Sequence, residues 1–198
     1  MQILHGLPVL SVIFLLSCGQ SGESDQLMRD KLMKEFQTKN VYQTIEQYGE
    51  HLVTIGGCSD CHTPKKMGSS GPIFDSTRML SGHIASMPLF EINRKEMQNK
   101  GLVVTNDLTA WAGPWGVSFS ANLTPDETGI ATWQVDQFKR AIRFGKYHGQ
   151  ENGRNLLPPM PWEMYRNMSD KELEAVFAYL KSLPPIENLV PAPLPPVK

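Results

Sequence analysis

The chain has 198 residues, of which 20% are charged, and its formal net charge is -1. This length predicts one domain with a sizeable core, and the balanced charge excludes the strongly basic surface by which proteins bind nucleic acid. The 15 prolines and 16 glycines predict long irregular connections between the regular elements.

The N-terminus has the features of an export signal. Residues 7–16 (LPVLSVIFLL) form a predominantly apolar run, too short to span a bilayer comfortably and typical of the h-region of a signal peptide. We therefore expect residues 1–17 to be a signal peptide that is removed during export.

The predicted signal ends in Leu15-Leu16-Ser17-Cys18, which resembles the lipobox of bacterial lipoproteins. The resemblance implies cleavage before Cys18 and lipidation of its thiol. The protein would then be anchored to a membrane of the bacterial cell envelope and face the periplasm, and Gly19 slightly favours the outer membrane. The alternative is a plain secretory signal with a cysteine that has no such role.

Residues 18–40 are expected to form a lipid-anchored tether followed by an amphipathic segment. Within residues 27–36 the apolar side chains fall at a helical spacing, namely Leu27, Met28, Leu32, Met33 and Phe36. Such a stripe either lies on the membrane surface or packs on its own domain. We favour packing on the domain.

A second helical stripe opens the domain that we expect over residues 41–185. Its apolar members, spaced by three and four residues, are Ile45, Tyr48, Leu52 and Ile55. Gly56 and Gly57 follow and predict a turn. The helix therefore leads directly into the next motif.

That motif is the run Cys58-Ser59-Asp60-Cys61-His62, the pattern of a c-type haem attachment site. Two thiols at this spacing can each add to one vinyl group of a haem, and the histidine can then ligate the iron. The alternatives are a redox dithiol and half of a zinc site. The sequence offers no second close pair of Cys or His for zinc and no βαβ pattern for a thioredoxin-like dithiol.

Residues 65–131 show little helical periodicity and contain many Gly and Pro breakers. Residues 103–105 and 108–111, joined by Asn106-Asp107, predict a short β-hairpin. Trp111, Trp115 and Phe119 are large apolar groups in this loop, and we expect them to cover the haem or the helices, or to be ordinary core aromatics.

Two further helices are predicted after the long loop. Residues 132–144 carry an apolar face and end at Gly145; the cations Arg140, Arg143 and Lys146 near its end are either solvated or in reach of a haem propionate. Ser169 and Glu172 form a capping box before a stripe that runs to Leu180. Residues 186–198 are a Pro-rich tail that is expected to wrap the surface or stay loose.

A second axial ligand for a haem is sought among the methionines and histidines. The candidates are Met67, Met79, Met87, Met160, Met164, Met168, His83 and His148. Met160 is favoured, because Pro158, Pro159 and Pro161 restrict the backbone around it and so hold a weak thioether ligand with little entropic loss. The alternative is a methionine that fills a gap in the core, the role expected for Met164 and Met168.

These features together resemble the class I cytochromes c: an apolar helix that ends in Cys-x-x-Cys-His, a methionine in a Pro-rich loop, and a C-terminal helix. The resemblance implies a mainly α, cytochrome c-like fold around one haem c. The N- and C-terminal helices would cross through residues 48–55 and 177–180, with a long irregular loop insertion. The predicted haem residues are Cys58, Cys61, His62 and Met160.

More narrowly, the chain from about Tyr48 to Pro185 resembles the cytochrome c subunits of bacterial membrane-bound alcohol and aldehyde dehydrogenases and related single-haem lipoproteins. The segments that carry this resemblance are 120–126, 128–130, 157–161, 168–170 and 178–180. Those subunits often carry several haems, whereas this chain has one attachment run.

A haem with histidine and methionine on its two faces has no open position for substrate and passes single electrons. We therefore expect an electron carrier rather than an enzyme, with redox proteins as partners. It would link a dehydrogenase or quinol-oxidising complex to an oxidase or another cytochrome. The alternatives are a haem subunit of a larger dehydrogenase complex, and a haem enzyme or gas sensor with an open sixth site near His83 or His148.

Overall fold

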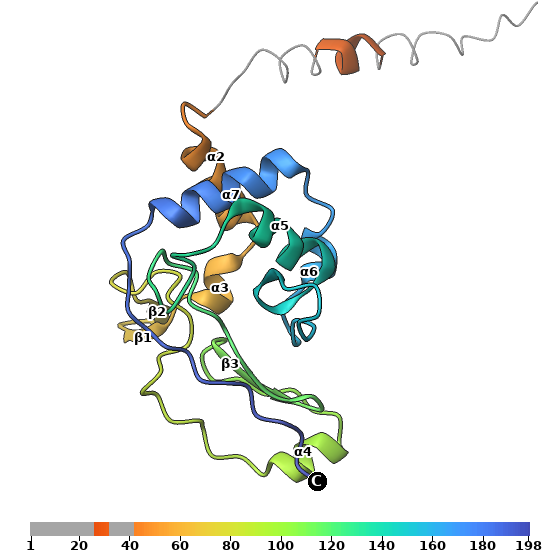
Figure 1. Cartoon of the computed structure of the whole chain (residues 1–198). Helices are drawn as coiled ribbons and strands as arrows, with labels where there is room; N and C mark the ends of the chain where they lie inside the picture. The colour runs from red at the N-terminus through yellow and green to blue at the C-terminus, as the bar shows by residue number, and fades with distance from the viewer. Residues whose placement is uncertain (1–25, 32–41) are drawn as a thin grey trace, which may run out of the picture. The chain divides into compact units, whose positions relative to one another are not determined.

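The computed structural model describes residues 26–31 and 42–198 (Figure 1). Residues 26–31 are a short helical segment, separate from the domain, in which Leu27 and Met28 are exposed. The predicted signal peptide, Cys18 and the rest of the 27–36 stripe lie outside the described residues, so the packing of that stripe stays a prediction. Within the described ranges, no helix is both long enough and apolar enough to cross a bilayer.

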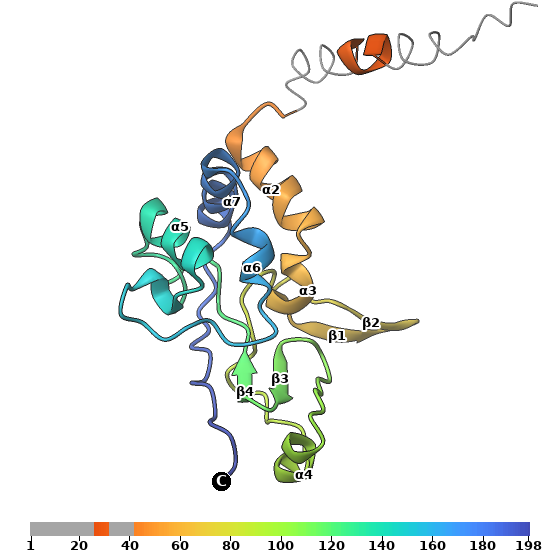
Figure 2. The same cartoon turned by 90° about the vertical axis from the view of Figure 1, so that its right-hand side faces the viewer.

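The domain is framed by helices α2 (Ile45–Ile55) and α7 (Asp170–Ser182), which pack on one another (Figures 1 and 2). Helix α2 begins where the Thr44 hydroxyl accepts the Gln47 N–H. Helix α7 begins at the predicted capping box, because Ser169 accepts the Glu172 N–H and the Glu172 carboxylate accepts the Ser169 N–H. The two terminal helices of the domain are therefore both present.

Helices α2 and α7 approach one another closely at Gly49. A Cβ built on this residue would lie 1.9 Å from the carbonyl oxygen of Ala175 and 2.7 Å from Cβ of Tyr179. One turn away, the Tyr48 hydroxyl donates to Oε1 of Glu172 at 3.5 Å. The contact expected between residues 48–55 and 177–180 thus includes Tyr179 and extends back along α7 to Ala175 and Glu172.

The predicted apolar stripe of α2 is wrong at both ends. Ile45 and Ile55 are 47% and 66% exposed, whereas the buried positions of the helix are Gly49, Leu52 and Val53. The partner helix lies against Gly49, which an apolar pattern does not count, so the buried face is rotated away from Ile55. Ile45 lies in the first turn, before the contact with α7.

The core fills the space between these helices and α5 (Val135–Phe144). Helix α5 begins three residues later than predicted, and Gly145 ends it in the left-handed conformation (φ 60°) as expected. The buried apolar core consists of Leu52, Val53, Leu80, Ile130, Phe138, Ile142, Leu173, Ala175, Val176 and Leu180. It is therefore assembled from both ends of the domain and from the loop at Leu80.

The long loop contains more regular structure than predicted. Strands β1 (Lys65–Gly68) and β2 (Gly71–Phe74) form one antiparallel hairpin, β3 (Ala110–Gly113) and β4 (Gly116–Phe119) form another, and α4 (Arg94–Asn99) lies between them in sequence. The hairpin predicted over 103–111 is corrected: the turn is at Pro114-Trp115, and Asn106-Asp107 is no hairpin turn. Val104 does pair with Ala112, through two backbone hydrogen bonds of 2.9 Å.

The Pro-rich tail is held against the domain. Leu194 exchanges two backbone hydrogen bonds of 2.9 Å with Val117 in β4, and Asn188 is only 4% exposed. In Figure 2 the tail runs beside β4. The domain is thus a helical core with two small two-stranded sheets, in which the last residues of the chain pack against the loop insertion.

Candidate haem site

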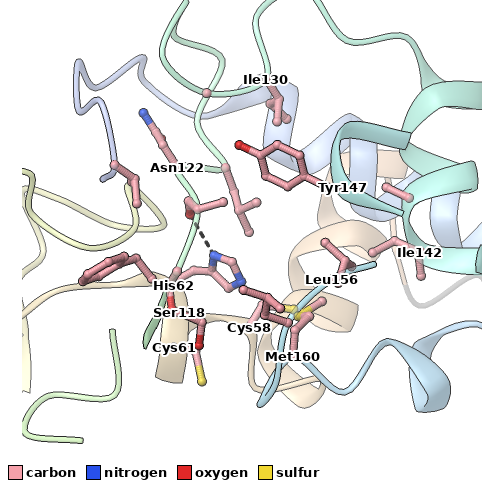
Figure 3. Close-up of a pocket in the computed structure, with 18 of the residues that line it drawn as sticks. Cys58, Cys61, His62, Ser118, Asn122, Ile130, Ile142, Tyr147, Leu156 and Met160 are labelled. Atoms are coloured by element: carbon pink, nitrogen blue, oxygen red, sulfur yellow. Dashed lines mark hydrogen bonds between the residues drawn. The ribbon is translucent and has the colours of Figure 1, made fainter. Parts of the chain in front are cut away.

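An apolar cavity of about 340 Å³ lies between the helical core and the loops, within the size range of cofactor sites. Its apolar lining includes Val53, Ile130, Phe138, Ile142, Leu156, Leu157, Val176 and Leu180. Figure 3 shows the side chains around it, with Cys58, Cys61, His62 and Met160 among them. All four predicted haem residues therefore line one cavity.

The attachment run forms helix α3 (Cys58–His62). Gly57 precedes it in the left-handed conformation (φ 65°), which glycine adopts without strain, so α2 can end and α3 can begin within two residues. Both thiols are free and half-buried. The short helix thus presents two thiols and an imidazole to the same cavity.

The two alternative interpretations of this run find little support. Burial raises the pKa of the Cys58 thiol to about 11, whereas the dithiols of redox motifs have lowered pKa values. Among residues 26–31 and 42–198, no three His, Cys, Asp or Glu side chains lie close enough to hold a metal ion together. A zinc site formed by these residues would have too few ligands.

The imidazole of His62 is oriented by a backbone carbonyl. Its Nδ1–H donates to the carbonyl oxygen of Ala121 at 2.8 Å, which leaves the lone pair of Nε2 available to a metal. Burial lowers the pKa of His62, and the bond to Ala121 only partly opposes this shift. The neutral imidazole, the form that binds iron, is therefore favoured.

Among the methionine candidates in the described residues, Met160 and Met168 line the cavity. Met67 and Met164 are 80% and 71% exposed, so the core position expected for Met164 is wrong: helix α6 (Trp162–Tyr165) turns it outward. Met79 and Met87 are partly buried elsewhere. The choice of a sulfur ligand thus narrows to two residues.

The loop that carries Met160 is tied to the second hairpin. The Ser118 hydroxyl in β4 donates to the carbonyl of Pro158 at 2.6 Å, and the Met160 carbonyl accepts the Trp162 N–H at 3.0 Å. The prolines restrict the backbone of the loop. The bond from Ser118 fixes the loop to β4, and the bond to Trp162 fixes it to the start of α6. The long loop insertion therefore helps to position Met160.

The two candidate histidines lie in different places. His83 is 2% exposed, its Nδ1 lies 2.8 Å from the Thr109 hydroxyl, and it does not line the cavity. His148 does line the cavity and stacks on Tyr147 at a centroid distance of 4.0 Å. Of the two, only His148 is placed where a distal residue would have to be.

The cations expected near a propionate are engaged elsewhere. Arg140 donates to Gly149, Arg143 pairs with Asp170, and Lys146 donates to Asn155; none lines the cavity. The cation that does line it is Arg154, stacked 3.9 Å over the ring of Tyr147. Periodicity on α5 could not indicate Arg154, because it lies in an irregular loop.

The loop aromatics divide between the two expected roles. Trp111 and Phe119 line the cavity. Trp115 instead packs over Gly113 and donates through its indole N–H to the Ser118 hydroxyl at 3.2 Å. Tyr165, which sequence reasoning missed, lines the cavity and donates to the Gly56 carbonyl at 2.5 Å.

The cavity residues fit a haem. The apolar wall suits a flat hydrophobic ring, the two thiols suit its vinyl groups, and the oriented Nε2 of His62 suits its iron.

A carbonyl acceptor such as Ala121 could not be predicted from the sequence, because every residue carries a carbonyl and only the fold selects one.

Comparison with known proteins agrees with this fit. The family model described as cytochrome c matches residues 46–184. One of the nicotinate dehydrogenase subunits of Pseudomonas putida is 41% identical over 80 residues, 40% of this chain and 6% of that protein. The gluconate 2-dehydrogenase cytochrome c subunit of Pantoea cypripedii is 41% identical over 69 residues, 34% of this chain and 15% of that protein.

The fructose dehydrogenase cytochrome subunit of Gluconobacter japonicus is 33% identical over 72 residues, which cover 36% of this chain and 14% of that protein. The matched part is thus a small share of each of these longer relatives. The family model, in contrast, spans the domain from the first turn of α2 to the residues just after α7. This chain belongs to the cytochrome c family.

Proposed function

We propose that the chain is a one-electron carrier with a single haem c, held covalently by Cys58 and Cys61 and ligated by His62 and Met160. The observation that supports this most is that all four residues line one apolar cavity. The haem would supply the interconversion of ferric and ferrous iron. The chain supplies the thiols, the oriented imidazole, the thioether and an apolar wall that excludes water.

These ligands set the direction of the electron chemistry. A thioether ligand favours ferrous iron and raises the reduction potential, whereas imidazole is the stronger donor to ferric iron. The apolar wall acts in the same direction as the thioether, because it disfavours the more highly charged ferric state. We therefore propose a carrier that accepts electrons readily and has no catalytic residue of its own.

The partners that we propose follow from the relatives, whose names place them in nicotinate, gluconate and fructose dehydrogenases. This chain would accept electrons from a dehydrogenase or a quinol-oxidising complex and pass them to an oxidase or another cytochrome. It does so either as a free carrier or as a bound haem subunit. Co-purification from detergent-solubilised membranes distinguishes the free carrier from the bound subunit. A dehydrogenase that co-purifies at a stoichiometric ratio would support the role of a bound subunit.

Carbon monoxide tests the carrier directly. We expect the reduced, unmodified protein to resist carbon monoxide at neutral pH, because both axial positions of the iron are filled. Visible absorption spectroscopy with and without the gas measures this. Rapid and complete binding would instead support a gas sensor or haem enzyme with an open site, in which His148 on the cavity wall would be the distal residue.

Covalent attachment gives a further prediction. Denatured protein should keep its haem through acid-acetone extraction, because two thioether bonds survive unfolding. The Cys58→Ser and Cys61→Ser double variant should release its haem into the solvent or fail to take it up. Haem absorbance in the precipitate and in the supernatant measures both, and extraction of haem from the unmodified protein would contradict the c-type site.

The membrane anchor gives another prediction, from the lipobox resemblance at Cys18. The Cys18→Ser variant should move from the membrane fraction to the soluble fraction with an unchanged haem spectrum, because the variant loses only the lipid chains. Sedimentation after a high-salt wash measures the change of fraction. The haem spectrum is the internal control, because Cys58 and Cys61 remain intact in the variant. A variant that still sediments would contradict the lipid anchor and with it the expected location, facing the periplasm on a membrane of the cell envelope, of which the outer one is slightly favoured.

A further inference from the structure

Residues 80–83 are a short segment of the loop insertion. They contact the backbone of His62, the proposed proximal ligand of the iron, and the side chain of the next residue, Thr63. The Gly82 N–H donates to the His62 carbonyl at 2.8 Å, and the Leu80 N–H donates to the Thr63 hydroxyl at 3.0 Å. On its other side, the segment pairs with residues 120–123 through two backbone hydrogen bonds of 2.9 Å. It therefore lies between the end of α3 and the irregular stretch 120–123, which contains Ala121.

Gly82 allows segment 80–83 to lie close against residues 120–123. It has a φ of +79°, and a Cβ here would lie 2.5 Å from the Ser120 carbonyl oxygen and 2.6 Å from both the carbonyl carbon and the oxygen of Ala121. The Ala121 oxygen is the acceptor of the His62 Nδ1–H. The position of this acceptor thus depends on where segment 80–83 is held.

The segment is held by Asn188 from the C-terminal tail. Its side-chain amide donates to the carbonyls of Ser81 at 2.7 Å and His83 at 2.8 Å, and its Oδ1 accepts the Ala85 N–H at 3.0 Å. Asn188 is 4% exposed. Every hydrogen-bonding group of its side chain is therefore used, and the two acceptors flank Gly82.

The same stretch of tail is also hydrogen-bonded to Asn122, the residue next to Ala121. The Ile186 carbonyl accepts the Asn122 amide N–H at 2.8 Å. The Thr128 hydroxyl accepts both the Asn122 amide at 3.1 Å and the Asn188 backbone N–H at 2.9 Å. Residues 186–188, which we name the tail clamp, therefore join segment 80–83 to the stretch that carries Ala121, the acceptor of His62.

We propose that Asn188 is a positioning residue for the proximal haem ligand: through segment 80–83 it fixes the Ala121 carbonyl against Nδ1–H of His62. The proposal rests on His62 being the iron ligand. A hydrogen bond at Nδ1 raises the basicity of a ligating imidazole and sets its orientation, and loss of such partners typically weakens metal sites. The tail clamp would thereby keep His62 a strong donor to ferric iron.

The Asn188→Ala variant tests this in the haem-loaded protein. We expect the Nδ1–H of His62, observed by NMR in the oxidised protein, to exchange with D2O on the order of tenfold faster, because the three side-chain hydrogen bonds of Asn188 that oppose opening are lost. The reduction potential should rise, because a less basic imidazole stabilises ferric iron less. Asn188→Ser, which replaces the carboxamide by a shorter side chain with one hydroxyl, should change both quantities less and serves if the alanine variant does not fold.

Two truncations separate positioning from general destabilisation. A chain that ends at residue 193 loses the pairing of Leu194 with Val117 but keeps Asn188 and the cavity-lining Pro191 and Pro193, and should retain the exchange rate and the potential of the full chain. A chain that ends at residue 187 should show the changes of Asn188→Ala or larger ones, because it also loses the tail residues that line the cavity. If Asn188→Ala or Asn188→Ser lowers only the unfolding midpoint, with exchange and potential unchanged, the positioning role is overturned. If the unmodified protein shows no Nδ1–H signal of an iron-bound His62, the ligand assignment itself fails.

Discussion

Replacing Met160 with alanine is expected to open the sixth coordination position of the iron and to lower the reduction potential. Met160 lines the cavity and is partly buried, and alanine cannot reach a metal. Water, added imidazole or carbon monoxide should then bind, and ferrous iron should lose the stabilisation that a thioether provides. Electrochemical titration and the sulfur-to-iron charge-transfer band of the oxidised protein measure the change.

The matched controls are two other methionines. Met164→Ala should change neither potential nor ligand binding, because this side chain is 71% exposed. Met168→Ala is the sharper control, since Met168 also lines the cavity. Met160→His should remain six-coordinate with a still lower potential, because imidazole donates more strongly to ferric iron. A charge-transfer band that persists in Met160→Ala but disappears in Met168→Ala would assign the sulfur ligand to Met168.

Features that depend on neighbours in the sequence were predicted well. The capping box at Ser169 and the left-handed Gly145 are local hydrogen-bonding and steric devices. The spacing of Cys58, Cys61 and His62 is likewise local, because one turn of helix presents all three to the same side. A sequence pattern could therefore locate the candidate haem site before the fold was known.

Side-chain contacts between distant segments were mostly not predicted. The acceptor of the His62 imidazole is 59 residues further along the chain, and Asn188 lies 107 residues from the Ser81 carbonyl that it binds. Nothing in the local pattern of a Pro-rich tail indicates a buried asparagine. Likewise, Met164 and Met168 look equivalent in the sequence, and only the turn of α6 exposes one of them.

The hairpin error has a similar cause. Val103-Val104 is a good strand sequence, and Val104 does pair with Ala112. The turn, however, forms at Pro114-Trp115 between Gly113 and Gly116. The tail then supplies Leu194 as a further partner of β4. This partner lies 77 residues from Val117, and local turn signals cannot reveal such a pairing.

The Gly49→Ala substitution is expected to destabilise the domain by about 2 to 3 kcal/mol. In an exposed helix the same change would stabilise by roughly 1 kcal/mol, because alanine has the higher helix propensity. Here the new methyl group would lie 1.9 Å from the Ala175 carbonyl oxygen, so α2 and α7 must move apart and lose packing between them. Guanidinium unfolding of the haem-loaded protein, followed by far-UV circular dichroism, measures the difference.

Glu50→Ala is the matched control for this prediction, because the next residue of the same helix is exposed. Its free energy of unfolding should stay within about 0.5 kcal/mol of the unmodified protein. Gly49→Ser should resemble Gly49→Ala, since its Cβ meets the same carbonyl. A stabilised Gly49→Ala would mean that the helices do not approach at this residue. A loss confined to Gly49 would instead identify a position where only glycine lets the two terminal helices close over the haem cavity.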